Sequence, residues 1–316
     1  MNNDFNINNF NSFIGQDNLK NQLKIAIYGA KKRNSSLGHI LLYGPPGLGK
    51  TTIARIIATE MNSNFIKINA PSIIKISDLI TLLANIKEND ILLIDEIHRL
   101  PIELEETLYE VMENFSLSII YKTNEGNKIM KYKLPKFTLI GATTNAGSIS
   151  FALRSRFSII YNFKYYSIND IKKLLFNNFN VLNINSNDEI LNFISLRCRF
   201  TPRIANNISL RLKDYLEFYN LNKLNKEILK DFFEIIKIFD DGLTEEDIKI
   251  IKVLKELYNN EPCSISTIAA TLNENPNNLL KINEPYLVYI KILVRTKKGR
   301  RLTNKGLEYY NKILNK

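Results

Sequence analysis

Two patterns of hydrophobic and polar positions divide the chain. Up to about residue 166, short apolar runs alternate with segments of helical periodicity. The strand-like runs are HILLYG, NFIKINA, DILLIDE and FTLIGATTN, and the helix-like ones are TTIARIIATEM and SDLITLLANIKE. This alternation predicts an α/β fold, a parallel sheet with helices on both faces. A hairpin interrupts it at residues 117–134, where two apolar-rich segments flank the turn signal Asn124, Glu125, Gly126 and Asn127.

Beyond residue 166 the apolar positions recur at helical spacing. Ser167 can cap the first helix, and the segments that follow predict a small helical domain. The polar run DDGLTEED, at 240–247, is interpreted as a hinge. After it come helical segments and a two-stranded hairpin that turns at Lys297 to Gly299, which indicates a winged helix. The predicted domains are residues 1–166, 167–239 and 240–316.

Composition narrows the class of protein. A chain of 316 residues that is 45% hydrophobic can bury more than one core. No apolar run approaches the ~18 residues of a membrane helix, and the first residues do not form a secretory signal, so we expect a cytoplasmic protein without a membrane partner. Cys198 and Cys263 are far apart and form no ligand spacing with His39 or His98, so neither a disulfide framework nor a zinc site is expected.

The net charge of +11 suits a polyanionic partner such as DNA. However, Asn, Ile and Lys are abundant along the whole chain, and a general compositional drift can produce most of this charge. The position of the arginines is therefore more informative than the total.

The strongest chemical signal is LLYGPPGLGKTT at residues 41–52. Gly44, Gly49, Lys50 and Thr51 fit the phosphate-loop pattern G-x-x-x-x-G-K-[ST], between an apolar strand and a helix. Backbone N–H groups at the helix N-terminus can hold the β-phosphate, Lys50 can reach the β- and γ-phosphates, and the Thr51 hydroxyl can ligate Mg²⁺. The sequence therefore predicts a nucleoside triphosphate site.

A second motif, DILLIDEIHRL, is an apolar strand that ends in adjacent carboxylates. Asp95 can hold the Mg²⁺ shell, and Glu96 can orient and deprotonate the attacking water. An Asp-Glu pair that only begins a helix is the competing interpretation. For His98 we favour a packing or hydrogen-bonding role over a catalytic one, because no nucleophile pattern lies near it.

Three later segments carry polar groups that could act on a nucleotide. Thr144, with Asn145 beside it, ends a strand at the sheet edge where α/β folds bind ligands, although an ordinary turn would look the same. Arg154 and Arg156 could neutralise transition-state charge, even from a neighbouring subunit, or could lie in a solvated loop. Arg203 falls in the first turn of a helix, where a cation opposes the dipole and calls for an anion such as a phosphate.

Taken together, GPPGLGKTT, ILLIDEIHRL, FTLIGATTNAG, LRSRF and TPRIAN, in this order and spacing, resemble the AAA+ ATPases. Within them, the chain is most similar to the bacterial motors that drive branch migration of Holliday junctions, and the resemblance covers nearly the whole chain. It implies an ATP hydrolase that forms a homohexameric ring, threads duplex DNA, and acts in recombination and repair with RuvA at the junction and RuvC in the resolving complex.

The resemblance also assigns roles to residues. It implies that Thr144 is sensor 1, that Arg156 is a finger reaching the adjacent subunit's site, that Arg203 is the sensor 2 arginine, and that Tyr166 contacts nucleotide at the domain junction. The implied catalytic set is Lys50, Asp95, Glu96, Thr144, Arg156 and Arg203, with the metal at Thr51 and Asp95. The implied ATP contacts are Gly47, Gly49, Lys50, Thr51, Thr52, Glu113, Asn114, Phe115, Arg156, Tyr166 and Arg203.

Two surfaces for macromolecular partners are implied as well. The hairpin around Gly126 matches the one that docks RuvA, with apolar contacts from Ile129, Met130 and Tyr132. In the winged head, the implied DNA-backbone contacts are Arg295 and Arg300, to which Lys297 and Lys298 add charge.

Two other functions are compatible with parts of the sequence. One is a clamp-loader-like AAA+ subunit, whose finger normally reads Ser-Arg-Cys, whereas this chain has Ser155, Arg156 and Phe157. The other is a DNA-binding protein that uses ATP as a switch without hydrolysis, against which Glu96 and Arg156 argue. The chain also has FNINNFNS where the family usually carries an Arg-Pro pair before FIGQ, so an altered N-terminal contact to adenosine is expected.

Overall fold

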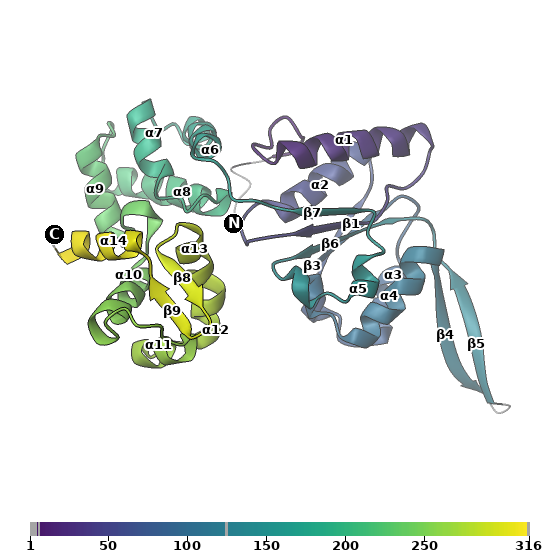
Figure 1. Cartoon of the computed structure of the whole chain (residues 1–316). Helices are drawn as coiled ribbons and strands as arrows, with labels where there is room; N and C mark the ends of the chain where they lie inside the picture. The colour runs from purple at the N-terminus through teal and green to yellow at the C-terminus, as the bar shows by residue number, and fades with distance from the viewer. Residues whose placement is uncertain (1–4, 6, 124–125, 315–316) are drawn as a thin grey trace. The chain divides into compact units, whose positions relative to one another are not determined.

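A computed structural model describes residue 5 and residues 7–123 and 126–314, without the side chains of 119–123, 126–129 and 313–314. The chain divides into two compact units (Figure 1). The first unit comprises Met1–Val181 and Thr201–Asn207, and the second comprises Leu182–Phe200 and Ile208–Lys316.

The first unit is built on a five-stranded sheet in the order β2-β3-β6-β1-β7. Every neighbouring pair is parallel. The strands are β1 (Ile40–Tyr43), β2 (Phe65–Asn69), β3 (Ile91–Asp95), β6 (Thr138–Thr143) and β7 (Ile159–Asn162). Residues 91–94 and all of β6 are buried, as expected for central parallel strands covered on both faces. The predicted α/β sheet is therefore confirmed.

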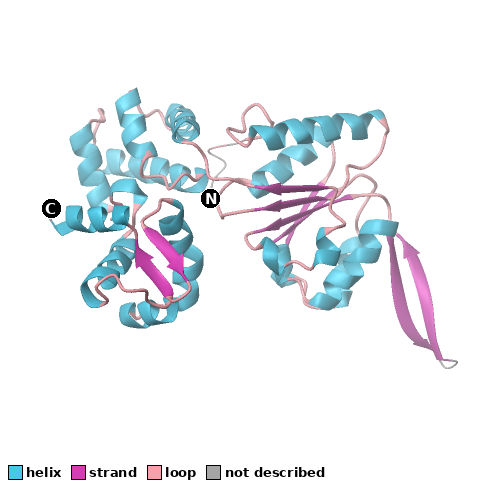
Figure 2. Ribbon diagram, viewed as in Figure 1, coloured by secondary structure: helices cyan, strands magenta, loops and turns pink. Residues whose placement is uncertain are grey.

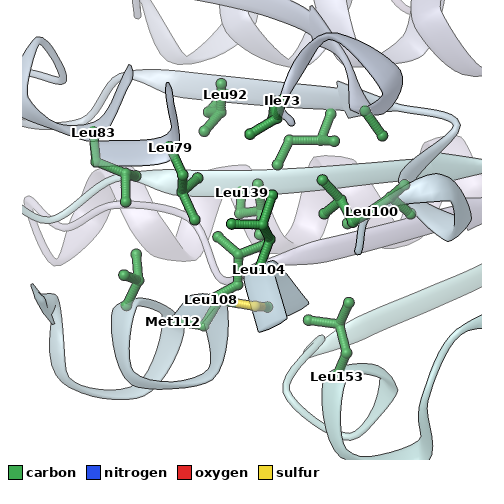
Figure 3. Close-up of a cluster of buried hydrophobic side chains, with 14 of the residues drawn as sticks. Ile73, Leu79, Leu83, Leu92, Leu100, Leu104, Leu108, Met112, Leu139 and Leu153 are labelled. Atoms are coloured by element: carbon green, nitrogen blue, oxygen red, sulfur yellow. The ribbon is translucent and has the colours of Figure 1, made fainter. Parts of the chain in front are cut away.

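Helices cover both faces of this sheet (Figures 1 and 2). On one side lie α1 (Asp17–Lys32) and α2 (Lys50–Met61), and on the other lie α3 (Ile76–Ala84), α4 (Ile102–Asn114) and α5 (Phe151–Arg154). Leu79 and Leu83 of α3 and Leu104 and Leu108 of α4 pack in one buried cluster with Leu139 of β6 (Figure 3). This apolar layer fixes the strands whose ends carry the polar residues described below.

A two-stranded ribbon extends from the first unit, as the pattern at residues 117–134 predicts. Strands β4 (Ser116–Thr123) and β5 (Gly126–Lys133) pair antiparallel, with Leu117 opposite Tyr132. Helix α4 ends at Phe115, whose φ of 47° turns the chain directly into β4. Asn124 and Glu125 of the predicted turn lie outside the described residues.

Helices dominate the chain after the sheet. They are α6 (Ile168–Val181), α7 (Asp188–Ser195), α8 (Pro202–Phe218) and α9 (Lys226–Ile235), as predicted from the periodicity. The asparagines Asn187 and Asn225 cap α7 and α9 by accepting hydrogen bonds from N3 amides.

The C-terminal part of the second unit has the predicted winged-helix pattern. Its helices are α10 (Glu245–Lys252), α11 (Ile265–Leu272), α12 (Pro276–Asn278), α13 (Glu284–Tyr289) and α14 (Asn304–Leu314), and its hairpin is β8 (Leu293–Thr296) with β9 (Gly299–Leu302). None of the helices in the described part of the chain is long and apolar enough to cross a membrane.

The polar run 240–247, which the sequence suggests is a hinge, is held by ion pairs in the structure. Asp240 pairs with Arg197 and with Lys312, and Asp247 is fully buried, 3.3 Å from the Nη1 of Arg199. The arginine partners of Asp240 and Asp247 precede α8 and are distant along the chain, so the sequence alone does not reveal these pairs. The run is a packed joint inside the second unit.

Candidate nucleotide site

The phosphate loop joins β1 to α2 in a shape that requires glycine. Gly44, Gly47 and Gly49 have φ of 136°, 80° and 98°. A Cβ on Gly44 would lie 2.6 Å from the carbonyl oxygen of Phe163, and one on Gly49 would lie 2.9 Å from the ring of Phe13. Gly49 is the N-cap of α2 and has no side chain to occupy the first amides of the helix. These N–H groups can therefore bind an anion.

Lys50 is the first residue of α2 and its side chain is buried. Its Nζ donates to the carbonyl oxygens of Gly44, at 2.8 Å, and Pro45, at 2.9 Å. Burial lowers the pKa of Lys50 to about 8, against the opposing effect of the Glu96 and Asp95 carboxylates. A triphosphate in the loop would supply the negative charge that this ammonium group lacks.

Thr51 and Asp95 come together as the metal prediction requires. The Thr51 hydroxyl donates to Asp95 Oδ2 at 3.3 Å, and the Nζ of Lys67 lies 3.4 Å from the same oxygen. Within the described ranges, no cluster of three or more His, Cys, Asp and Glu residues could hold a metal ion. A threonine hydroxyl and one carboxylate nevertheless fit Mg²⁺, which usually takes few protein ligands and completes its shell with water and phosphate oxygens.

Glu96 lies between two neighbouring strand ends. Its backbone is left-handed, with φ 52° and ψ 41°, which is uncommon for a residue with a side chain. Thr144, just after β6, donates to Glu96 Oε2 at 3.1 Å. His98 Nδ1 lies 3.2 Å from the same oxygen and 2.9 Å from the Thr143 hydroxyl. The predicted water-activating carboxylate is thus held by the predicted sensor, and the contacts of His98 agree with the hydrogen-bonding role favoured for it.

Arg203 and Tyr166 flank the loop, both within the first unit. The Arg203 amide donates to the carbonyl oxygen of Gly47 at 3.3 Å, and the Tyr166 hydroxyl donates to that of Leu48 at 3.2 Å. Burial raises the pKa of Tyr166, so its hydroxyl remains a donor at ordinary pH. Both residues therefore lie against the phosphate loop.

Arg156 contacts residues of α4 and not residues of the phosphate loop. Its Nη2 is 3.0 Å from Glu113 Oε1, and its guanidinium carbon is 4.4 Å from the centroid of the Tyr109 ring. The Nε of Arg156 is buried and has no hydrogen-bond partner within the part of the chain that the structure describes. These contacts link the segment just after α5 to α4, not to the phosphate loop.

The nucleotide contacts predicted at the end of α4 are near Arg156 and not near the phosphate loop. Glu113 forms its ion pair, and Phe115 packs between His39 and Phe137, at centroid distances of 5.8 and 6.0 Å. Asn114, the last residue of α4, lies between Glu113 and Phe115 in the sequence. Thr52, by contrast, follows Thr51 in α2. The structure therefore separates the predicted site into a loop group and an α4–α5 group.

Three residues at the nucleotide site are not among the sequence-based candidates. Phe13 packs against Gly49, Gln16 donates to the Lys164 carbonyl oxygen at 2.7 Å, and Lys67 lies beside Asp95. Lys67 belongs to β2, which pairs with β3, and a lysine in an apolar strand is the one sequence signal that could have pointed to it.

The structure also places the residues that were predicted to contact macromolecular partners. Met130 and Tyr132 are exposed on the ribbon, whereas the side chain of Ile129 lies outside the described residues. In the winged head, Arg295 and Arg300 face each other across β8 and β9. Both contact the carboxylate of Glu284.

Three family models match successive parts of the chain. They are the Holliday junction DNA helicase RuvB P-loop domain at residues 6–163, the RuvB AAA lid domain at 166–238, and the RuvB C-terminal winged helix domain at 240–311.

Full-length relatives agree with these matches. The Holliday junction branch migration complex subunit RuvB of Fusobacterium nucleatum is 42% identical over 304 residues, covering 96% of this chain and 92% of the relative. The RuvB subunit of Pediococcus pentosaceus is 40% identical, covering 95% and 89%. Among solved structures, the Thermotoga maritima RuvB Holliday junction branch migration motor superposes with a TM-score of 0.87 at 35% identity, covering 98% of both chains.

Proposed function

Because the chain belongs to the RuvB family of P-loop ATPases, we propose that it is the ATP-driven motor of Holliday-junction branch migration in recombination and repair. The observation that carries this proposal is the contact between Thr144 and Glu96 beside the Thr51–Asp95 pair. It joins the predicted sensor, base and metal ligand at one edge of the sheet, where α/β folds bind ligands.

The residues of the loop group have complementary tasks in hydrolysis. Bound Mg²⁺ would neutralise charge on the β- and γ-phosphates of ATP. Lys50 would bind the same phosphates, and Thr51 and Asp95 would hold the ion. When the γ-phosphate attracts the Thr144 hydroxyl, Glu96 Oε2 loses one of its hydrogen bonds and can accept a proton from water. Arg203 adds positive charge beside Gly47.

Assembly into a ring of six copies would explain why the α4–α5 group lies away from the phosphate loop of its own copy. Arg156 contacts Glu113 and Tyr109 and has a buried Nε, so in one copy it is organised away from the phosphate loop. An arginine that approaches from a neighbouring copy can stabilise the charge of the transition state. Hydrolysis at each junction between copies would then depend on how those copies are oriented.

Two surfaces outside the ATPase site suit the proposed binding partners RuvA and DNA. The exposed Met130 and Tyr132 suit an apolar partner, for which we propose RuvA, and RuvC would join in the resolving complex. The basic wing, with Arg295 and Arg300, suits the phosphates of duplex and junction DNA. A protein with these partners would act in the bacterial cytoplasm.

The alternatives fit less well. A clamp-loader-like subunit does not account for the match of residues 240–311 to a winged-helix domain. A non-hydrolysing switch would not need Glu96 hydrogen-bonded to Thr144. Neither alternative is favoured by a separate observation.

The test is a junction-unwinding assay with the cognate RuvA, ATP and Mg²⁺. We expect the wild type to migrate the junction and Glu96→Gln to bind ATP without migration. Glu106→Gln, which removes the same charge from an exposed position on α4, is the matched control and should migrate normally. A wild type that hydrolyses ATP but moves no junction would refute the motor, and an active Glu96→Gln would refute the assignment of the base.

A further inference from the structure

The wing hairpin presents two different faces. Its register pairs Leu293 with Leu302 and Arg295 with Arg300, and these four side chains share one face because residues alternate along a strand. The two leucines are buried, so this face points into the head. Arg295 and Arg300 therefore lie on the inward side of a strongly basic hairpin.

A single buried carboxylate accepts hydrogen bonds from both arginines. Glu284, at the start of α13, is 2% exposed. Its Oε1 accepts from the Nε of Arg295 at 2.6 Å and from the Nε of Arg300 at 2.9 Å, and its Oε2 accepts from the Nη2 of Arg300 at 3.3 Å. One negative charge between two guanidinium groups leaves one positive charge uncompensated.

The two arginines use this carboxylate differently. The side chain of Arg300 is 21% exposed and gives two donors to Glu284, whereas that of Arg295 is 55% exposed and gives only its Nε. Within the described residues, the terminal amino groups of Arg295 thus have no hydrogen bond or ion pair, and the side chain is more than half exposed. A guanidinium fork held by its Nε is suited to a phosphate, which accepts two parallel hydrogen bonds.

The residue before Glu284 belongs to a buried polar network. The neighbouring Asn283 is buried and donates to Asp247 Oδ1 at 2.8 Å, and Asp247 Oδ2 pairs with Arg199. The start of α13, from which the Glu284 side chain extends, is therefore fixed to α10 next to the buried carboxylate.

We propose that Glu284 is a positioning residue for DNA binding. It holds Arg295 and Arg300 side by side so that their outer donors meet one backbone phosphate of a duplex, which supplies the missing negative charge. This inference rests on the proposed function, because it requires that the wing binds DNA.

The two possible roles of Glu284, reducing charge and positioning the arginines, predict opposite changes in DNA affinity. If Glu284 only reduces the positive charge of the wing, its removal should tighten binding to DNA. If it positions the arginines, its removal should weaken binding although the protein becomes more positive. The sign of the change therefore separates the two roles.

The test measures the Kd of full-length protein for a blunt 30-base-pair duplex at several salt concentrations, with Glu284→Gln compared with Glu308→Gln. Glu308 is exposed on α14 of the same head, so its variant controls for the change of charge. We expect Glu284→Gln to weaken binding about tenfold, the size of one lost charge-assisted hydrogen bond. Equal or tighter binding by Glu284→Gln would overturn the proposal, whereas failure of the wild type to bind any duplex would instead refute the proposed function.

A second variant keeps the charge and leaves Glu284 intact. Arg295→Lys should weaken binding almost as much as Arg295→Ala, because an ammonium group cannot bond Glu284 through one donor and a phosphate through a planar pair. Arg295→Lys with wild-type affinity would show that charge alone matters and would overturn the proposal even if Glu284→Gln were too unstable to measure.

Discussion

At the scale of single residues, Arg156 is the side chain whose loss should separate binding from turnover. It lies on Glu113 and Tyr109 and not on the phosphate loop. We expect Arg156→Ala to bind ATP with nearly unchanged affinity and to lose turnover by roughly 10³-fold or more. The measurements are equilibrium nucleotide binding and steady-state ATPase, with Arg154→Ala as the neighbouring control.

Mixing experiments show whether Arg156 acts between copies. An Arg156→Ala copy keeps an intact Glu96, and a Glu96→Gln copy keeps an intact Arg156. Mixed in equal amounts, the two inactive variants should regain part of the ATPase activity. A mixture that stays inactive would contradict an action in trans.

Lys50 makes ATP binding dependent on pH. Its pKa in the free protein is about 8, below the ordinary lysine value because of burial. Phosphates favour the charged form and raise this pKa, so binding takes up a proton when the pH lies between the two values. We expect affinity to fall as the pH rises above 8.

Calorimetry can detect this proton. At pH 8.5, the heat of ATP binding should differ between buffers of different ionisation enthalpy by an amount that corresponds to proton uptake. Lys50→Arg, which stays charged, should abolish the part of the uptake that Lys50 causes. Identical heats for the wild type in both buffers would contradict the pKa shift.

Most of the loop group could be predicted because motifs specify it locally. Lys50 and Thr51 are adjacent, and Asp95 and Glu96 end one strand. Lys67 and Glu284 could not be found this way, since their importance comes from strand pairing and from a contact between α13 and the wing. Sequence spacing does not reveal such partners.

At the scale of elements, the β4–β5 ribbon should act as a separable docking site. Met130 and Tyr132 are both exposed and lie two positions apart, on the same side of β5. We expect Met130→Asp with Tyr132→Ser to remove stimulation by RuvA, because a charge replaces apolar contact area. Pull-down with RuvA and RuvA-dependent ATPase check this.

The control is Lys133→Ser, on the other side of the same strand. It should retain docking, because its side chain alternates away from Met130 and Tyr132. Loss of docking in both variants, or in neither, would contradict an apolar docking face.

Elements with strong apolar patterns could be predicted from the sequence, whereas the short strand β7 and the C-terminal helix α14 could not. Strand β7 has only four residues, alternates between partly buried and exposed positions, and pairs with β1 alone. Helix α14 begins two residues after the end of β9, and its periodicity is short. The packing of 240–247 depended on Arg197 and Arg199, whose position relative to that run is set only by the folded chain.

At the scale of the whole molecule, the two units do not follow the order of the sequence. Residues 201–207, with Arg203, belong to the first unit, whereas the segments on either side of them belong to the second. The second unit is therefore stabilised by contacts between distant segments, such as Arg199 with Asp247.

Arg199→Ala should destabilise this unit strongly. Asp247 is 0% exposed, and removing its cation leaves a buried carboxylate that, among the described residues, is supported by hydrogen bonds from Thr244 and Asn283. Breaking a buried pair costs about 3–5 kcal/mol, and these hydrogen bonds place the expected loss near the lower end, about 3 kcal/mol. Denaturant unfolding, with the exposed Arg301→Ala as control, measures it; equal stability of the two variants would show that the pair contributes little.

The left-handed backbone of Glu96 has a consequence for engineering. Glycine adopts φ near 52° without the steric cost that a glutamate bears, so Glu96→Gly relieves local strain while it removes the base. Selection for heat resistance alone would therefore tend to enrich proteins that survive higher temperatures and no longer hydrolyse ATP. A thermostable variant of this motor therefore has to be selected for ATP turnover as well as for heat resistance.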